Sequence, residues 1–460
     1  MHFTRRLLDP RRPGSLESKT IDVNVLNARR LVVLSLLAAG ALGIGCSSSD
    51  DPDDLRVDDA GVDASTTTDA ADVEASSPRD AGLVDAAPLH VVCTSQPCAT
   101  SLVTTLGKSE DDRSEGFCVL LDDGTVACWG ANSAGQLGRG EDGGRVDSAN
   151  AAKVVGLSNI VSLDHTCAVD NSGGAWCWGT GPFRWSDAGV ATTTETTPVK
   201  LDLPSATQVG LGYRTACAGV GDGVLCWGNN TNGQIGPLTE TFRGPQHVSL
   251  PSGAAVRAID VGKTTFVLRE DGSLVTWGGN PGIGRVSPSF PDPYPQLVAL
   301  EGVTTADLAY DNACVTANGN GYCWGARVDA KKGNVLDRAL PEPVIAPEPL
   351  VQIATTQTFV MPSGVIQPYR WCGVASTGNV YCWGLNESGQ AGDGTEDYVL
   401  RAAKVGGLPA PAAQVKTTTS TTCALLTTGK VYCWGGNYYG QLGNGQNRGK
   451  VSDPTEVVLP

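Results

Sequence analysis

The sequence predicts an all-β protein, specifically a seven-bladed β-propeller whose blades are four-stranded antiparallel sheets. One stretch recurs seven times, each copy carries the signals of a β-hairpin, and further β-like runs precede each hairpin. The clearest copy, residues 423–443, reads CALLTTGKVYCWGGNYYGQLG. Its Trp-Gly pair recurs every 47 to 59 residues, a period typical of repeat architectures. The seven tryptophans are Trp129, Trp178, Trp227, Trp277, Trp324, Trp383 and Trp434.

The hairpin in each copy is predicted from its turn residues. Copies with nine residues between the two cysteine positions leave a three-residue loop, and glycine is its third member. A left-handed residue is needed there, which glycine adopts without strain. Copies with eight residues between the cysteines leave two-residue loops instead, with residues that primed turns require. The three-residue loops end at Gly124, Gly173, Gly272, Gly378 and Gly429, and the two-residue loops are Gly221-Asp222 and Asn318-Gly319.

Cysteines that face each other on the two hairpin strands lie within disulfide reach. Copy four has Phe266 and Thr276 in their place, so both members are lost together. Each bridge would contribute about 2–3 kcal/mol. The predicted pairs are Cys118 with Cys128, Cys167 with Cys177, Cys217 with Cys226, Cys314 with Cys323, Cys372 with Cys382, and Cys423 with Cys433. Before the first blade, Cys93 and Cys98 form a seventh possible pair.

Two alternatives to disulfides can be weighed from the sequence. Metal binding would need a Cys-x-x-Cys motif or a matching histidine cluster, and neither occurs. Free buried thiols are expected instead if the chain stays in a reducing compartment.

Two further β-like runs lie upstream of each hairpin, for example residues 153–157 and 159–163, which gives four strands in a unit of about 50 residues. With its Trp-Gly and Gly-Gln-Leu-Gly signatures, the repeat resembles the regulator of chromosome condensation repeat family. That resemblance implies a seven-bladed propeller over residues 89–460. WD repeats would need Trp-Asp pairs, which the copies lack. Kelch repeats would need a Gly-Gly in every copy, and it does not recur in every copy.

The first blade lacks a first strand in this interpretation, because residues 100–106 match the second run of the other copies. Residues 454–460, Pro-Thr-Glu-Val-Val-Leu-Pro, resemble the runs that open later repeats. We therefore expect the C-terminal strand to close the ring by pairing into the first blade.

Residues 1–45 are predicted to be a targeting segment. Arg29-Arg30 precedes a 15-residue apolar run, residues 31–45, which is too short to span a bilayer comfortably. The run ends at Gly45-Cys46 and resembles a bacterial lipoprotein signal. Cleavage would leave Cys46 as a lipid-modified N-terminus at the cell envelope, with the outer membrane as the expected location. An uncleaved membrane anchor is the alternative, and translation could also start nearer Val23.

Residues 46–88 are predicted to be a disordered acidic tether of Ala, Asp, Ser and Thr. This segment holds 12 acids and two arginines with almost no large apolar groups. Its Asp clusters lack the Gly and terminal Glu of a calcium loop. Of the net charge of −15, residues 1–45 account for +4 and residues 47–88 for −10, so −9 is left for the propeller. No basic stripe exists, which argues against nucleic-acid binding.

Loops that follow Trp-Gly and loops that precede the first cysteine strand are expected on one face of the propeller, which we call the long-loop face. Aromatic and arginine side chains gather there, as in many binding hot spots. The alternative is that each aromatic packs beneath its own loop. The candidate residues are Asp164, His165, Phe183, Arg184, Trp185, Phe242, Arg243, Phe290, Tyr294, Phe359, Tyr369, Trp371, Tyr398, Tyr438 and Tyr439.

The repeated tryptophans are expected in the core or between blades. Asp164-His165-Thr166 resembles the loop with which the family's exchange factor contacts its GTPase, but a single match does not transfer that activity. No catalytic motif is present, and we expect no cofactor or metal. The leading hypothesis is a monomeric, non-enzymatic binding propeller for a protein or glycan. The alternatives are a polysaccharide hydrolase or lyase, which would need acids converging near the axis, and a passive envelope component.

Overall fold

The computed structural model describes residues 87–460, apart from short gaps at 142–143, 187–188, 238–240, 329–334, 358, 361–365 and 368–369. The predicted signal segment, Cys46 and almost the whole predicted tether lie outside the described residues, so these remain predictions. Among the residues described, no helix is long and apolar enough to cross a membrane.

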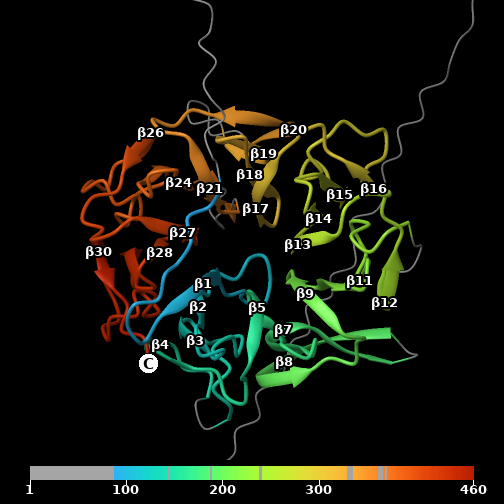
Figure 1. Cartoon of the computed structure of the whole chain (residues 1–460), viewed down its shortest axis with the longest axis horizontal. Helices are drawn as coiled ribbons and strands as arrows, with labels where there is room; N and C mark the ends of the chain where they lie inside the picture. Colours follow the sequence, from blue (N-terminus) through green and yellow to red (C-terminus); the bar gives the residue numbers. More distant parts are fainter. Residues whose placement is uncertain are drawn as a thin grey trace, which may run out of the picture. The chain divides into compact units, whose positions relative to one another are not determined.

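Seven four-stranded antiparallel sheets are arranged around a central axis, which confirms the predicted propeller (Figure 1). The innermost strands are β1 (Ala99–Thr104), β5 (Ile160–Asp164), β9 (Ala206–Leu211), β13 (Val256–Val261), β17 (Val303–Ala309), β21 (Leu350–Thr355) and β27 (Ala412–Thr417). The second strands are β2 (Gly116–Leu121), β6 (Cys167–Asp170), β10 (Thr215–Val220), β14 (Thr264–Arg269), β18 (Asn312–Ala317), β24 (Arg370–Ala375) and β28 (Thr421–Leu426).

Each second strand turns back into a strand that ends near the Trp-Gly pair, and an outer strand then covers it. The third strands are β3 (Val126–Gly130), β7 (Ala175–Ser186), β11 (Gly223–Asn229), β15 (Leu274–Gly278), β19 (Asn320–Val328), β25 (Val380–Gly384) and β29 (Val431–Gly436). The outer strands are β4 (Ser148–Lys153), β8 (Gly189–Lys200), β12 (Phe242–Val248), β16 (Asp292–Leu297), β20 (Val335–Val344), β26 (Val399–Lys404) and β30 (Lys450–Glu456). Two short strands, β22 (Phe359–Val360) and β23 (Ile366–Gln367), pair within the sixth blade's inner loop.

The predicted hairpin registers are confirmed. Cys118 pairs directly with Cys128, and the glycine that closes this three-residue loop, Gly124, has φ 75°. In the two-residue loop of the fifth blade, Asn318 and Gly319 both have positive φ, as a primed turn requires.

All seven predicted disulfides are present, so the register places the opposed cysteines as expected. The bond before the first blade joins Cys93 and Cys98. Repeat four, which lacks cysteines, places Phe266 opposite Thr276 at the same register. The six hairpin disulfides join Cys118 and Cys128, Cys167 and Cys177, Cys217 and Cys226, Cys314 and Cys323, Cys372 and Cys382, and Cys423 and Cys433.

The expected ring closure by the C-terminal strand is wrong. β30 is the outer strand of the seventh blade, and the first blade builds all four of its strands from its own residues. The prediction placed the first residue of each blade at the wrong point of the repeat. Residues 153–157 do not open the second blade: β4 ends at Lys153, and Val154 and Leu157 are buried between the first two blades. Their apolar character reflects packing between blades and not a strand of the next sheet.

The core lies between the blades, and the repeated tryptophans are central to it. In five blades the indole Nε1 donates a hydrogen bond to a carbonyl that follows the Trp-Gly pair of the preceding blade, at N···O distances of 2.6–2.9 Å. We call this bond the tryptophan joint. Gly138 and Gly443, which end Gly-Gln-Leu-Gly loops, lie against the indoles of Trp178 and Trp129, whereas a Cβ on Gly236 in the third blade would meet nothing within 4 Å. A Cβ on Gly138 (φ 62°) would stand 3.1 Å from the Trp178 ring, so the joint requires glycine there.

Two blades depart from this pattern. Trp434 is fully buried, but its Nε1 has no partner within the described part of the chain. The carbonyl of Gln390, which corresponds to the usual acceptor, instead accepts from Thr422 Oγ1 (2.6 Å) and from buried Arg370 Nη1 (3.2 Å). Trp383 is only partly buried and stacks on Trp371, with 6.0 Å between ring centroids.

The ring closes between the seventh and first blades through the same joint. Trp129 Nε1 donates to the Gln441 carbonyl at 2.7 Å, across 312 residues of sequence. Two more contacts cross this seam. The Leu102 amide donates to Gln414 Oε1 (2.9 Å), and the buried Glu115 carboxylate accepts from the Ser420 amide (2.9 Å) and hydroxyl (2.6 Å). Closure is therefore non-covalent and uses the ordinary contact between blades.

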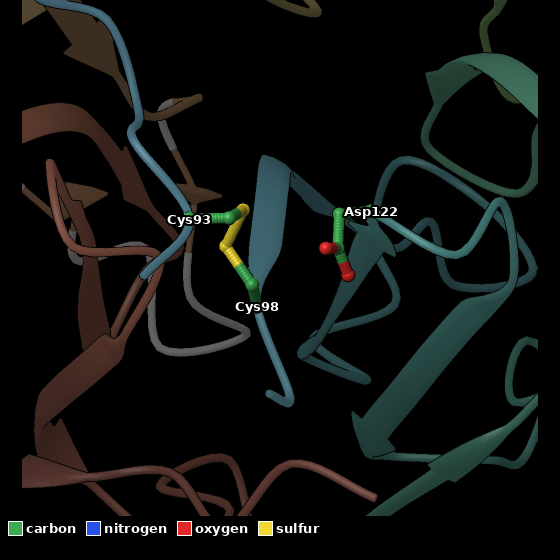
Figure 2. Close-up of side chains that lie close together, drawn as sticks. All are labelled: Cys93, Cys98 and Asp122. Atoms are coloured by element: carbon green, nitrogen blue, oxygen red, sulfur yellow. A yellow bond between two sulfur atoms is a disulfide. The ribbon is translucent and has the colours of Figure 1, made fainter. Parts of the chain in front are cut away.

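The segment before β1 lies over this seam on the hairpin side. The Val92 amide donates to the Thr427 carbonyl (2.7 Å), and the Ala99 amide to the Gly429 carbonyl (2.9 Å). Figure 2 shows the Cys93–Cys98 disulfide facing Asp122 of the first blade's hairpin. These three residues are near enough to share an ion, but the two sulfurs are bonded to each other and are not thiolate ligands. The disulfide and Asp122 hold the segment before β1 against the first blade.

The tryptophan joint can be weighed because one blade lacks it. Replacing Trp178 with Phe removes the bond to the Gln136 carbonyl (2.9 Å) and leaves that buried acceptor unpaired. The same change at Trp434 removes similar volume and no hydrogen bond. We expect Trp178→Phe to lower the free energy of unfolding by about 1–3 kcal/mol more than Trp434→Phe. Denaturant unfolding measures this, and equal losses would show that the joint contributes packing alone.

Candidate binding face and axial cavity

The two faces of the propeller differ in how their loops are built. The hairpins that join second and third strands have loops of two or three residues, fixed in length by the register of the opposed cysteine positions. Loops that join first to second strands and third to outer strands meet on the other side, the long-loop face, and vary in length. The first blade alone places residues 105–115 and 131–147 there. Variation in surface chemistry is therefore concentrated on one face.

Every exposed large aromatic side chain among the described residues lies at the long-loop face. Each is in a loop after Trp-Gly or at the beginning of the outer strand that follows. Phe290 is 83% exposed and Tyr438 62%. The complete set is Phe242, Phe290, Tyr294, Tyr398 and Tyr438. All five belong to the candidate set proposed from the sequence.

Other candidates pack into the molecule. Phe183 is buried in the core between blades two and three. Trp185 is partly buried against Trp227, with ring centroids 5.7 Å apart, and Trp371 is partly buried against Trp383. These three aromatic side chains therefore pack into the molecule, which was the alternative to a role in binding.

The remaining candidates are placed as follows. Arg184 is exposed and pairs with Glu195 at 2.7 Å. Arg243 and Tyr439 are partly buried. The Phe359 side chain and Tyr369 lie outside the described residues. His165 Nδ1 donates to the Thr104 carbonyl (2.8 Å), and the Asp164 carboxylate accepts from the Leu211 amide (2.9 Å), so both bind neighbouring blades.

The loops after Trp-Gly are held by their own side chains. In the first blade, Asn132 Oδ1 accepts from the Leu137 amide (3.0 Å), and Gln136 Oε1 accepts from the Ala134 amide (2.8 Å). Blades three, six and seven repeat both bonds. The Gln136 carbonyl also accepts the hydrogen bond from the indole of Trp178 in the next blade. These loops are therefore a rigid support for what they display.

Four charged side chains converge on the axis from equivalent positions. Each stands on an innermost strand opposite the first cysteine position of its blade: Asp164, Asp260, Asp307 and Lys416. All four line one cavity of about 120 Å³. Lys416 Nζ donates to Asp307, whose other oxygen accepts from the Thr355 amide at 2.8 Å. Within the described part of the chain, Asp260 has no hydrogen bond of this kind.

Burial sets the charge state of this cluster. Burial and the nearby Asp164 carboxylate raise the pKa of Asp260 to about 8, although Lys416 opposes the shift. Burial would lower the pKa of Lys416, but the Asp307 and Asp260 carboxylates outweigh it and leave that pKa raised. At neutral pH the cluster therefore holds Asp260 largely protonated beside a charged lysine.

Residues 105–115 of the first blade, which we call the cap loop, cross over this cavity at the long-loop face. Asp112 organises the loop by accepting from the Lys108 amide (2.8 Å) and the Ser114 amide (3.0 Å). Glu110 reaches the far side of the ring, where Tyr310 Oη donates to its carboxylate at 3.4 Å and Gln357 Nε2 to its carbonyl. The axial acids therefore lie beneath a loop that joins the first blade to the fifth and sixth.

The hydrolase hypothesis required acids near the axis, and three are present. Their setting does not suit that chemistry. A cavity of about 120 Å³ is smaller than the roughly 300–1,000 Å³ of small-molecule sites, the cap loop crosses it, and Lys416 already pairs with one of the three carboxylates, that of Asp307. Such a cavity is small for a polysaccharide chain.

Of the four axial residues, only Asp164 was proposed from the sequence, and Asp260, Asp307 and Lys416 were missed. A partial signal was present: each is a charged residue within a short β-like run, but its distance to the first cysteine position of its blade varies from 3 to 7 residues. Asn132 and its equivalents were also missed, although they recur beside Trp-Gly. Buried Arg370 carries no repeat signal, because it occurs in one blade only.

The fold and its joints define a class of protein: a propeller whose blades are locked by a Trp-Gly hairpin and a Gly-Gln-Leu-Gly loop. Models of the regulator of chromosome condensation (RCC1) repeat match residues 114–136, 413–441 and 428–460. The chain is therefore a seven-bladed propeller whose first and last blades match the RCC1 repeat.

Several known proteins are similar to the chain. The ultraviolet-B receptor UVR8 of Arabidopsis thaliana is 28% identical over 354 residues, 72% of this chain and 77% of the receptor. Protein pim1 of Schizosaccharomyces pombe is 28% identical over 327 residues, 60% of this chain and 59% of pim1. The human E3 ubiquitin-protein ligase HERC2 is also 28% identical, over 70% of this chain but only 7% of the ligase.

Solved structures show the same fold. Prp20p from Saccharomyces cerevisiae superposes with a TM-score of 0.58 at 18% identity, covering 74% of this chain and 87% of Prp20p. Human WBSCR16 also gives 0.58, at 17% identity, covering 73% of this chain and 95% of that protein. At these identities the likeness concerns the fold.

The axial cluster predicts how stability varies with pH. Because Asp260 has a folded-state pKa of about 8, against 3.8 ordinarily, folding retains a proton that the unfolded chain releases above pH 4. This contribution is complete below pH 4 and is lost as pH rises through 8, on the order of a few kcal/mol. Asp260→Asn cannot ionise, so its stability relative to wild type should grow between pH 5 and pH 9. A constant difference in denaturant unfolding would contradict the assignment.

Proposed function

We propose that this chain is an envelope-anchored, non-enzymatic binding propeller that holds a protein partner on its long-loop face. The observation that carries the proposal is the distribution of exposed aromatics. All five in the described residues lie on that face, and the hairpins of the opposite face end in small polar turns. Exposed aromatics mounted on rigid loops are typical of interface anchors.

The relatives support a protein partner over a glycan. Prp20p was characterised for its binding to Gsp1p and histones, and yeast RCC1 (Prp20) was solved bound to Kap60. These partners belong to those proteins. What we take for this chain is the kind of ligand, a protein surface met by the loops of a propeller.

Anchoring at the envelope rests on the sequence. The Gly45-Cys46 signal and the acidic segment after it would place the propeller at the end of a tether. Seven disulfides within residues 87–460 suit an oxidising compartment, where such bonds persist. The intracellular partners of the relatives are then out of reach, and the partner would be an exported or surface protein.

Mass spectrometry of the membrane-extracted protein tests the anchor. We expect a chain that begins at Cys46, carries a diacyl or triacyl mass on that residue, and has its other 14 cysteines oxidised. Reduction and alkylation should label those cysteines and leave the lipid in place. A full-length, unlipidated chain with free thiols would refute the envelope assignment.

Paired substitutions test the binding face. Phe290→Ala with Tyr438→Ala should leave the unfolding free energy within about 0.5 kcal/mol of wild type, because both side chains are exposed. Cross-linking capture from the envelope fraction should lose most of its partner. The matched control is Ile345→Ala, since Ile345 is 92% exposed and follows the end of outer strand β20, on the hairpin side and away from the long loops. Equal capture by both variants would count against this face.

A further inference from the structure

A second pocket, of about 260 Å³, opens on the long-loop face beside the axis. Loops between the first and second strands of three successive blades build it. Tyr213 and Arg214 come from the third blade, Lys263 from the fourth and Tyr310 from the fifth, with Asn232 from the third blade's outer loop. None of these five residues was proposed as a binding residue from the sequence.

The pocket is rigid. The Lys263 amide donates to the Tyr310 carbonyl (3.0 Å), and the Asn229 amide to the Arg214 carbonyl (2.8 Å), so backbone bonds within and between blades fix the loops. The two tyrosine rings meet edge to face with 6.0 Å between centroids. Tyr310 has φ 56°, a left-handed conformation unusual for a side chain of its size.

Two cations in this pocket have no carboxylate partner among the residues that the structure describes. The Lys263 ammonium lies 4.7 Å from the centroid of the Tyr310 ring, a cation–π contact that leaves its charge uncompensated. Arg214 is exposed, and no acid of the described residues forms an ion pair with it or with Lys263. Glu110 of the cap loop also lines the pocket, but its carboxylate is directed to the Tyr310 hydroxyl.

Exposed apolar side chains flank the pocket on its outer side. Phe242 pairs in register with Asn229, which lines the pocket. The neighbouring blade continues this edge, since Gly233 lies close against Pro293, which precedes Tyr294. Phe242 and Tyr294 are each about half exposed. Two cations without an acidic partner in the described part of the chain therefore lie beside exposed aromatic side chains.

We infer that this pocket is the anchor site for the partner, and that it receives an acidic side chain flanked by apolar residues of a protein segment. The carboxylate would accept from Arg214 and Lys263, and the apolar neighbours would cover Phe242 and Tyr294. Charge complementarity selects an acid, because a basic group would meet two like charges. The inference rests on the proposed function and specifies the chemistry of its ligand.

The experiment uses the full-length protein and a phage-displayed library of random peptides. We expect the enriched peptides to carry Asp or Glu beside aromatic or aliphatic residues. A synthetic peptide from this set should bind the double variant Arg214→Glu with Lys263→Glu at least about tenfold more weakly than wild type. Changing the peptide's own acid to the amide should cost a similar factor, and added salt should weaken binding.

The control variant is Arg401→Glu with Arg448→Glu, which makes the same change in net charge at two exposed arginines of blades six and seven. It should bind like wild type, and both double variants should keep the wild-type melting curve.

Three outcomes would overturn the inference. Peptides that bind the Arg214 and Lys263 variant normally, but fail on Phe290→Ala with Tyr438→Ala, would do so and leave the proposed function standing. Enrichment of basic peptides would also do so. If no peptide is enriched and oligogalacturonate binds instead, both the inference and the protein-partner proposal fail.

Discussion

The hydrogen bond that a buried indole donates to the preceding blade, present in five of the seven blades, is the contact on which this propeller depends. Apart from contacts across the axis, such as the Lys416–Asp307 pair and those of the cap loop, a blade packs against its two neighbours, so the stability of the ring depends on every seam. The tryptophan joint links three parts of the repeat at once: the hairpin that carries Trp, the loop that supplies the carbonyl, and the glycine that lets them approach. The seam that closes the ring obeys the same rule, at Trp129 and Gln441.

The same contact explains the division of labour between the faces. Hairpin loops cannot lengthen without moving the cysteine pair out of register, so the loops of the hairpin face remain short and vary little. Loops after Trp-Gly are pinned at one point by the joint and braced by residues such as Asn132 and Gln136, and beyond those points they are free to differ. The fourth blade uses that freedom to expose Phe290, and the second to bury Phe183.

The local features of this chain and its seven-bladed architecture could be predicted from the sequence, because the hairpin signals recur seven times, but the individual contacts between blades could not. Loop length and glycine position predicted the hairpins, because both are decided within a dozen residues. The first residue of a blade was misplaced, since a period does not say where a repeat begins. The apolar residues Val154 and Leu157 suggested a strand. They are apolar because they pack between the sheets of the first two blades.

The axis and the exposed aromatics show the same limit. Asp307 and Lys416 meet only when the inner strands converge, so no short stretch of sequence predicts their ion pair. Phe183 and Phe290 look alike in sequence, although the first is buried between blades and the second is exposed.

The disulfides have a consequence for how this molecule is made. Six of the seven join residues 9 or 10 positions apart within one hairpin, and the seventh spans 5. A chain that emerges N-terminus first can therefore oxidise each pair as soon as its hairpin forms, with little opportunity for a wrong partner. Only the Trp129–Gln441 seam must wait for the last blade. The disulfides can therefore form one after another along the chain, from the N-terminus to the C-terminus. The slow, long-range closure of the ring then depends on a hydrogen bond, which can form and break reversibly.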